Sequence, residues 1–266
     1  MMRGRSTIPK QVERIARDGS STLVAREWVP EVPVALEFNG LSYAVMMATP
    51  SDLADFATGF AICEGLARNA GEVGSVDIAE TGQGWIVRAQ LSGLGIDKLQ
   101  DRVRTRVAES SCGLCGIENL EALAAPLPRV ANHDAIETSA IFRALDELPT
   151  HQPLGSATGA AHAAALADTD GAIWLAREDV GRHNALDKLV GAAGRRGLDM
   201  AAGFILSTAR CSYEIVEKTV RSGGTRLVTI SLPTSMANSR AREAGLTLYA
   251  LARSDSILAI CDGSER

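Results

Sequence analysis

The second half of the chain alternates between short apolar segments and amphipathic segments that end at glycine. We expect strands at 172–176, 204–206, 227–230 and 246–251, with helices at 182–193, 213–220 and 235–244 between them. Serial strand–helix–strand units place their strands parallel, because each crossover helix returns the chain to the same edge of the sheet. The pattern therefore predicts an α/β domain with a mainly parallel sheet.

Polar segments follow the expected strands of this domain. They are residues 178–184, 207–212, 231–235 and 252–256, and three of them contain an arginine: Arg182, Arg210 and Arg253. In open α/β sheets, ligands bind beyond the carboxyl ends of the strands, beside helix N-termini. Arginine pairs well with phosphate oxygens. The sequence predicts that a phosphate-bearing small molecule binds at this edge.

The first half of the chain predicts a smaller α+β unit. Asn39-Gly40 separates two apolar runs and is a strong hairpin signal, because both residues tolerate positive φ. Thr49 is expected to cap the next helix, and Pro50 to occupy its first position. A second strand pair is expected within 74–91, and a helix at 97–108.

These patterns predict four segments of the chain and three elements within the last segment. The segments are a flexible arm at 1–26, a small α+β domain at 27–109, a cysteine loop with a helix and linker at 110–135, and an α/β cofactor-binding domain at 136–266. Within the last, we expect a helix at 139–148, a small-residue loop at 155–158, and then a helix that carries His162.

Cys112 and Cys115 form a Cys-x-x-Cys pair in a loop with glycine at 113 and 116. A structural zinc site needs four ligands, and no second cysteine pair or close histidine pair supplies the others. A thioredoxin-like pair would follow an early strand of a βαβ unit. An incidental structural pair is a third reading. The fourth, which the glycine-hinged loop favours, is a sulfur-carrying loop in which one cysteine accepts a persulfide.

A zinc-dependent nucleobase deaminase also uses a Cys-x-x-Cys pair, but it requires His-x-Glu upstream. No histidine of this chain is followed two residues later by glutamate, and Ser111 stands where the proline of such enzymes would be. The sequence therefore excludes that chemistry, and we expect no protein-ligated metal.

Cysteine usage and charge limit the partners. Five cysteines is an odd count in 266 residues and fits a reducing cytoplasm, where Cys63, Cys211 and Cys261 would be small buried side chains. A net charge of −5 argues against broad binding to nucleic acid or anionic membranes. No run approaches the ~20 apolar residues that cross a bilayer, and the polar, basic residues 1–17 lack a secretory signal.

Several polar residues allow both a functional and a structural interpretation. His183 lies near an expected helix start and could contact a ligand or cap the helix. Asp187 and Lys188, one turn on, could order the ligand crevice or form a solvated face. For His162 we favour a buried, hydrogen-bonded role. For Arg253, a ligand role and a surface role remain equally open.

The cysteine loop at 110–116, taken with the string Glu-Asp-Val-Gly-Arg-His-Asn-Ala-Leu-Asp-Lys at 178–188, strongly resembles the formate dehydrogenase accessory sulfurtransferase family, the FdhD family. Supporting stretches lie at 158–162, 210–214 and 233–235. The resemblance runs from about residue 27 to residue 261, and the eleven-residue string is its most specific part.

The resemblance implies a cytoplasmic, usually dimeric sulfurtransferase. Such a protein accepts sulfur from a cysteine desulfurase and passes it to the bis(molybdopterin guanine dinucleotide) molybdenum cofactor, which makes formate dehydrogenase active. By the resemblance, Cys112 carries the persulfide and Cys115 is accessory. The implied fold is a cytidine-deaminase-like α/β domain with a smaller N-terminal domain. A non-enzymatic cofactor chaperone and a thiol–disulfide redox protein remain as rival functions.

The resemblance also places a cofactor-binding segment near the end of the chain, and we expect His183 and Arg210 to join it. The segment consists of Leu251, Ala252, Arg253, Ser254, Asp255 and Ser256. Family members often show Phe-x-Arg-Gly-Asp-Arg here. This chain keeps the first arginine and the aspartate but differs at 251, 254 and 256. Thr208-Ala209 likewise replaces a commoner Ser-Gly before Arg210.

Overall fold

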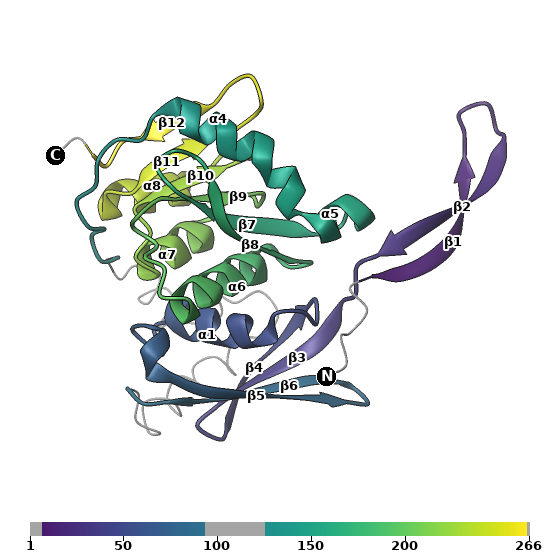
Figure 1. Ribbon diagram of the computed structural model, residues 1–266, viewed down its shortest axis with the longest axis horizontal. Helices are drawn as coiled ribbons and strands as arrows, with labels where there is room; N and C mark the ends of the chain where they lie inside the picture. The colour runs from purple at the N-terminus through teal and green to yellow at the C-terminus, as the bar shows by residue number, and fades with distance from the viewer. Residues whose placement is uncertain (1–6, 94–125, 265–266) are drawn as a thin grey trace.

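The structure is a computed structural model that describes residues 7–93 and 126–264 (Figure 1). Two sheets enclose a layer of helices. A four-stranded sheet covers helix α1, α1 packs on α6, and α6 lies on a six-stranded sheet whose far side is covered by α4. The 14-residue helix α6 is therefore central to the molecule. None of the helices in the described ranges is both long and apolar enough to cross a bilayer.

The four-stranded sheet has the order β4-β3-β6-β5. Its strands are β3 (Val32–Phe38), β4 (Leu41–Ala48), β5 (Val73–Thr81, preceded by the 3-10 turn η1, Ala70–Glu72) and β6 (Gly84–Leu91). The Asn39-Gly40 turn is confirmed, with φ of 52° and 79°. Both residues therefore occupy the left-handed region that a tight hairpin requires. The expected strand pair within 74–91 is also confirmed.

Helix α1 spans Leu53–Cys63, and the predicted cap at Thr49 is wrong. Asp52 precedes the first helical residue, with φ 52°. Thr49 is buried, and its Oγ1 instead accepts a hydrogen bond from the Val180 N–H at 3.1 Å. A long-range partner has replaced the local capping bond that the sequence suggested.

The six-stranded sheet has the order β12-β11-β10-β9-β7-β8. Its elements along the chain are β7 (His162–Ala167), β8 (Ile173–Asp179), α6 (Arg182–Arg195), β9 (Phe204–Ser207), α7 (Tyr213–Arg221), β10 (Arg226–Thr229), α8 (Ser235–Ala244), β11 (Thr247–Ala250) and β12 (Leu258–Cys261). Before them come α4 (Thr138–Glu147), η2 (Leu148–His151) and α5 (Pro153–Thr158). The expected helix at 139–148 and the strand–helix alternation after residue 171 are confirmed.

The sheet is mixed, so the prediction of a mainly parallel sheet needs correction. Only the pairs β9–β10 and β10–β11 are parallel; β7 runs antiparallel to both of its neighbours, and β12 runs antiparallel to β11. The strands β8, β9, β10 and β11 nevertheless point the same way. Their carboxyl ends therefore share one edge of the sheet, as the sequence predicted.

The expected helix around His162 is wrong, because this residue begins strand β7. The run 163–167 is rich in alanine, which favours a helix locally. In the structure this run is a fully buried strand between β8 and β9, with Ala164 and Leu166 facing one core and Ala165 and Ala167 the other. Small side chains suit a strand covered on both faces, so tertiary packing has overridden the propensity. Likewise, the expected loop at 155–158 belongs to helix α5.

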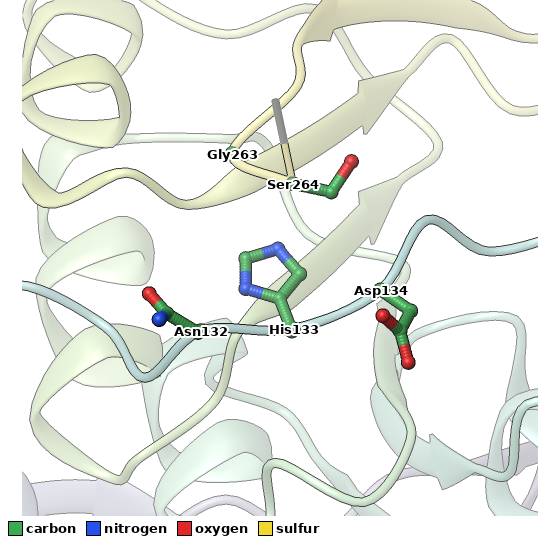
Figure 2. Close-up of a pocket in the computed structure, with 5 residues that line it drawn as sticks. All are labelled: Asn132, His133, Asp134, Gly263 and Ser264. Atoms are coloured by element: carbon green, nitrogen blue, oxygen red, sulfur yellow. The ribbon is translucent and has the colours of Figure 1, made fainter. Parts of the chain in front are cut away.

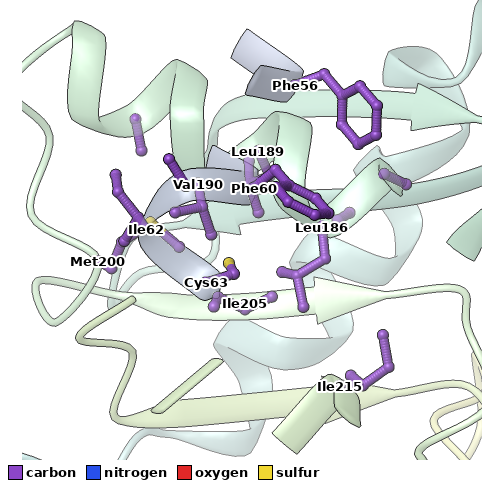
Figure 3. Packing of buried hydrophobic residues seen from close by; sticks show 14 of the residues in the cluster. Phe56, Phe60, Ile62, Cys63, Leu186, Leu189, Val190, Met200, Ile205 and Ile215 are labelled. Atoms are coloured by element: carbon purple, nitrogen blue, oxygen red, sulfur yellow. The ribbon is translucent and has the colours of Figure 1, made fainter. Parts of the chain in front are cut away.

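The main core is continuous from the small sheet through α1 to the large sheet. Phe56 and Phe60 of α1, Leu186 and Leu189 of α6, and Ile205 of β9 all belong to this core, and Phe60 lies beside Leu186 (Figure 3). The helices can approach this closely because glycines face each other. A Cβ on Gly59 would lie 1.7 Å from the Asp187 carbonyl oxygen.

Residues 8–28 form a β-hairpin that projects from the body of the molecule (Figure 1), although the sequence suggested a flexible arm through residue 26. Strands β1 (Ile8–Ile15) and β2 (Ser21–Trp28) pair antiparallel, and Gly19 in the turn has φ 83°. The hairpin was missed because both of its faces mix polar and apolar residues. Most of its side chains remain exposed, including Leu23 at 77% and Ile15 at 72%.

Candidate functional site

The eleven-residue string at 178–188 is mostly a buried structural element. Glu178 accepts hydrogen bonds from the N–H groups of Leu154 and Gly155, at 2.8 and 2.7 Å, and so holds the start of α5. These two bonds engage both carboxylate oxygens of Glu178, which is 8% exposed. Its role is to fix α5 beside β8.

Asp179 and Lys188 join the two halves of the molecule. Both side chains are fully buried and form an ion pair, and Lys188 also donates to the Thr49 carbonyl at 2.9 Å. Asp179 accepts from the N–H groups of Thr49 and Gly181, and from Asn184 Nδ2. A buried charge pair is favourable only when its remaining hydrogen-bonding capacity is satisfied, as it is here. This network holds the end of β4 against the start of α6.

Asp187 lies in a second buried charge cluster with Lys218 of α7. The Lys218 ammonium is 2.8 Å from Asp187, 3.5 Å from Glu64, and 5.5 Å from the centre of the Phe60 ring. Burial raises the pKa of Asp187. Burial disfavours the Lys218 charge, but Asp187 and Glu64 outweigh it and raise the pKa of Lys218. The reading of Asp187 and Lys188 as a solvated face is therefore wrong.

Two residues of the string do face the edge at the carboxyl ends of the strands. Arg182 and His183 are the first two residues of α6. His183 Nε2 lies 2.9 Å from Glu214 Oε2, in the first turn of α7. The contact with His183 lowers the pKa of Glu214, so this carboxylate stays ionised near neutral pH. The pair brings the N-termini of two helices together.

His162 joins this edge because β7 runs antiparallel to its neighbours, which places its first residue among their last ones. Burial lowers the pKa of His162, and the charges of Arg182, Arg210 and His183 lower it further. Each of these three side chains is therefore close enough to act on His162. The sequence could not place His162 here, since that required the direction of β7.

The loop after β9 carries Arg210, whose side chain is exposed. Thr208 accepts a hydrogen bond from the Ala163 N–H through Oγ1 at 2.8 Å. This hydroxyl ties the end of β9 to β7.

The segment 251–256 follows β11 at the same edge. Leu251 has φ 46°, a left-handed conformation, and Ala252 is buried. Arg253 is exposed, and its guanidinium donates to the carbonyl oxygens of Ile230 and Ala252. The three residues that follow, Ser254, Asp255 and Ser256, are exposed. Contact of this segment with a cofactor stays a prediction.

Cys112 and Cys115 lie outside the described residues. The three described cysteines are poor candidates for sulfur chemistry, because burial raises the pKa of each thiol: Cys63, Cys211 (to about 11) and Cys261. Cys63 and Cys211 are buried and Cys261 is half-buried, which agrees with the sequence-based expectation for the first two. Within 7–93 and 126–264, no three His, Cys, Asp or Glu side chains gather as metal ligands.

A pocket lies at the opposite edge of the large sheet (Figure 2). It is lined by Asn132, His133, Asp134, Gly263 and Ser264. His133 Nε2 is 2.8 Å from the hydroxyl of Thr247, the first residue of β11. The pocket therefore lies at the amino end of that strand, away from the edge formed by the carboxyl ends.

Comparisons with known proteins agree with the sequence motifs. The model of the FdhD/NarQ family matches residues 29–266. The chain is 44% identical to a sulfur carrier protein FdhD of Variovorax paradoxus, over 88% of this chain and 84% of the relative. It is also 44% identical to one of Chromobacterium violaceum, over 89% and 88%.

A solved structure shares the fold. The crystal structure of a proposed formate dehydrogenase accessory protein from Desulfotalea psychrophila superposes with a TM-score of 0.73 and covers 96% of each chain, at 24% identity. The family match spans both sheets, the buried 178–188 string and the edge at the carboxyl ends of the strands. The chain therefore belongs to the FdhD/NarQ family.

Proposed function

We propose that this protein is a sulfurtransferase that carries sulfur as a persulfide on Cys112. The observation that carries the proposal is the relationship to sulfur carrier proteins across nearly the whole chain. The chemistry of the other cysteines supports it, because the buried or half-buried thiols of Cys63, Cys211 and Cys261 form little thiolate at neutral pH. Sulfur transfer then falls to the Cys-x-x-Cys pair.

The proposed loading step begins with a persulfide on a cysteine desulfurase. The Cys112 thiolate attacks the outer sulfur of that persulfide, a new S–S bond forms on Cys112, and the donor cysteine leaves as a thiolate. No electrons are gained or lost overall, and the proton balance is unchanged. Cys115 is proposed as an accessory thiol.

We propose that the acceptor is the bis(molybdopterin guanine dinucleotide) molybdenum cofactor, bound as substrate at the edge formed by the carboxyl ends of the strands. The client would be a formate dehydrogenase, and the protein would act as a cytoplasmic homodimer. Arginine side chains and helix N-termini at this edge suit the phosphates of a dinucleotide. A cytidine-deaminase-like description of the large domain is supported by the order β8-β7-β9-β10-β11 with β7 antiparallel.

The test is mass spectrometry after incubation with a cysteine desulfurase and cysteine. We expect an adduct of one sulfur atom on Cys112, absent in Cys112→Ser and present in Cys261→Ser, the control with a half-buried thiol. Formate dehydrogenase maturation should fail with Cys112→Ser and tolerate Cys115→Ser better. A pure chaperone would tolerate both changes, and a thiol–disulfide redox protein would need both cysteines.

A further inference from the structure

Three buried polar atoms at this edge make no hydrogen bond in the part of the chain that the structure describes: Nε of Arg182, Nε2 of His183 and Oγ of Ser212. Nε2 of His183 still has a partner, because it lies 2.9 Å from Glu214 Oε2 in an ion pair. Nε of Arg182, the first residue of α6, and Oγ of Ser212, the residue before α7, have none among the described residues. Buried donors in folded proteins are nearly always paired, and an unpaired donor is costly. The Arg182 and Ser212 atoms therefore point to an acceptor that the described residues do not provide.

The same place holds two helix starts without side-chain caps. Gly181 precedes α6 and has no side chain, and Ser212 makes no capping bond to α7. The first N–H groups of a helix have no acceptor within it and carry partial positive charge. The contact of His183 with Glu214 links the two first turns, so these groups lie near one another.

The charged side chains there leave a positive balance. Arg182 and Arg210 both act on His162, and Arg182 also acts on Glu214. At the two helix starts these guanidinium groups face the carboxylate of Glu214, which His183 contacts. Arg253 and Asp255 add one charge of each sign at the same edge, so it stays locally positive in a chain whose net charge is −5.

We propose that the starts of α6 and α7 form an oxyanion seat for a phosphate or pyrophosphate group. The seat consists of Arg182 Nε–H, the Ser212 hydroxyl and the first-turn N–H groups of both helices. The proposal deepens the proposed function and rests on it for the identity of the ligand as a dinucleotide. It assigns the phosphates to Arg182 and Ser212 rather than to Arg253, whose guanidinium is already bonded to the carbonyl oxygens of Ile230 and Ala252.

Calorimetric titration of the full-length protein with inorganic pyrophosphate, and separately with GDP, tests the seat. Arg182→Met should weaken both by roughly 10- to 150-fold, because a charge-assisted bond is lost, and Ser212→Ala by about 2- to 10-fold. Arg143→Met is the matched control, because Arg143 is an exposed arginine of α4 that contacts the Asp170 carbonyl before the start of β8, and it should bind both as the unaltered protein does. Unchanged binding by Arg182→Met, or an equal loss in Arg143→Met, would overturn the proposal.

Hydrogen exchange of the unaltered protein gives a second test that does not depend on a variant that folds. Saturating pyrophosphate should slow exchange at residues 182–184 of α6 and 214–215 of α7, and absence of protection at both helix starts would refute the seat. The two proposals fail separately. Arg182→Met should still acquire sulfur on Cys112, whereas a missing adduct in the unaltered protein would contradict only the sulfur carrier function.

Discussion

Replacing Lys188 with methionine removes a buried charge from the contact between α6 and the end of β4. Lys188 is 0% exposed, pairs with Asp179, and donates to the Thr49 carbonyl oxygen at 2.9 Å. Methionine has a similar length and fills much of the same volume, so the change isolates the charge more than the packing. It leaves the Asp179 carboxylate buried without a cation.

The size of the expected loss in stability depends on the hydrogen bonds that Asp179 keeps in the variant. Breaking a buried ion pair by removing one partner costs about 3–5 kcal/mol. Three donors remain on Asp179: the N–H groups of Thr49 at 3.0 Å and Gly181 at 2.7 Å, and Asn184 Nδ2 at 3.0 Å. These bonds keep part of the carboxylate stabilisation, so we expect a loss near the lower end, about 3 kcal/mol.

Urea denaturation followed by circular dichroism measures this loss. With a slope of about 3 kcal/mol per molar urea, the midpoint should fall by about 1 M. Arg88→Met is the control: Arg88 pairs with Glu37 at 2.8 Å but is 46% exposed, so its loss should cost less than about 1 kcal/mol. If Lys188→Met is no more destabilising than Arg88→Met, the Asp179–Lys188 pair does not hold the two halves together.

Three further predictions follow from contacts at α1, α7 and the buried thiols. His183→Phe should raise the pKa of Glu214 toward its ordinary value, because the contact with His183 lowers it. The stability that this contact contributes is present above the unfolded-state pKa of Glu214 and is lost as the pH falls through the lower folded-state pKa. An NMR titration of the Glu214 carboxyl that shows no rise in its pKa would contradict this. Gly59→Ala should destabilise the fold by about 1–3 kcal/mol or more in thermal unfolding, because its Cβ would lie 1.7 Å from a backbone oxygen of α6. The control Gly82→Ala, whose Cβ meets nothing within 4 Å, should be nearly neutral. Equal effects of the two variants would show that α1 and α6 adjust freely. Cys211, with a pKa of about 11, should have a thiolate fraction on the order of one in a thousand at pH 8. We therefore expect it to resist alkylation by iodoacetamide until the protein unfolds. Rapid labelling of Cys211 in the native protein, measured by mass spectrometry, would refute its burial.

Local signals in the sequence predicted several elements well. The Asn39-Gly40 turn depends only on backbone freedom at two neighbouring residues, and both have positive φ. Helices α7 and α8 start after Ser212 and Thr234, and α6 starts after Gly181; all three end within a few residues of the expected bounds. Because the order of strands and helices follows from such signals, the edge with Arg182 and Arg210 could be predicted too.

Long-range contacts decided what local signals misjudged. The run after His162 looks helical in isolation, but its small side chains fit a strand covered on both faces. Thr49 looks like a helix cap, but Val180 is its partner, 131 residues away. Lys188 looks like a surface residue until Asp179 and Thr49 surround it.

The sequence by itself determined the family, the order of strands and helices, and the edge of the sheet where polar loops gather, since each depends on neighbouring residues or on a motif. The tertiary structure alone decided that β7 enters the sheet antiparallel and brings His162 to that edge. It also decided that most residues of the 178–188 string are buried and connect α6 with the end of β4, while Arg182 and His183 face the edge. The physical reason is that burial and pairing of charges depend on residues more than a hundred positions apart, such as Thr49 and Lys188, which no local pattern connects.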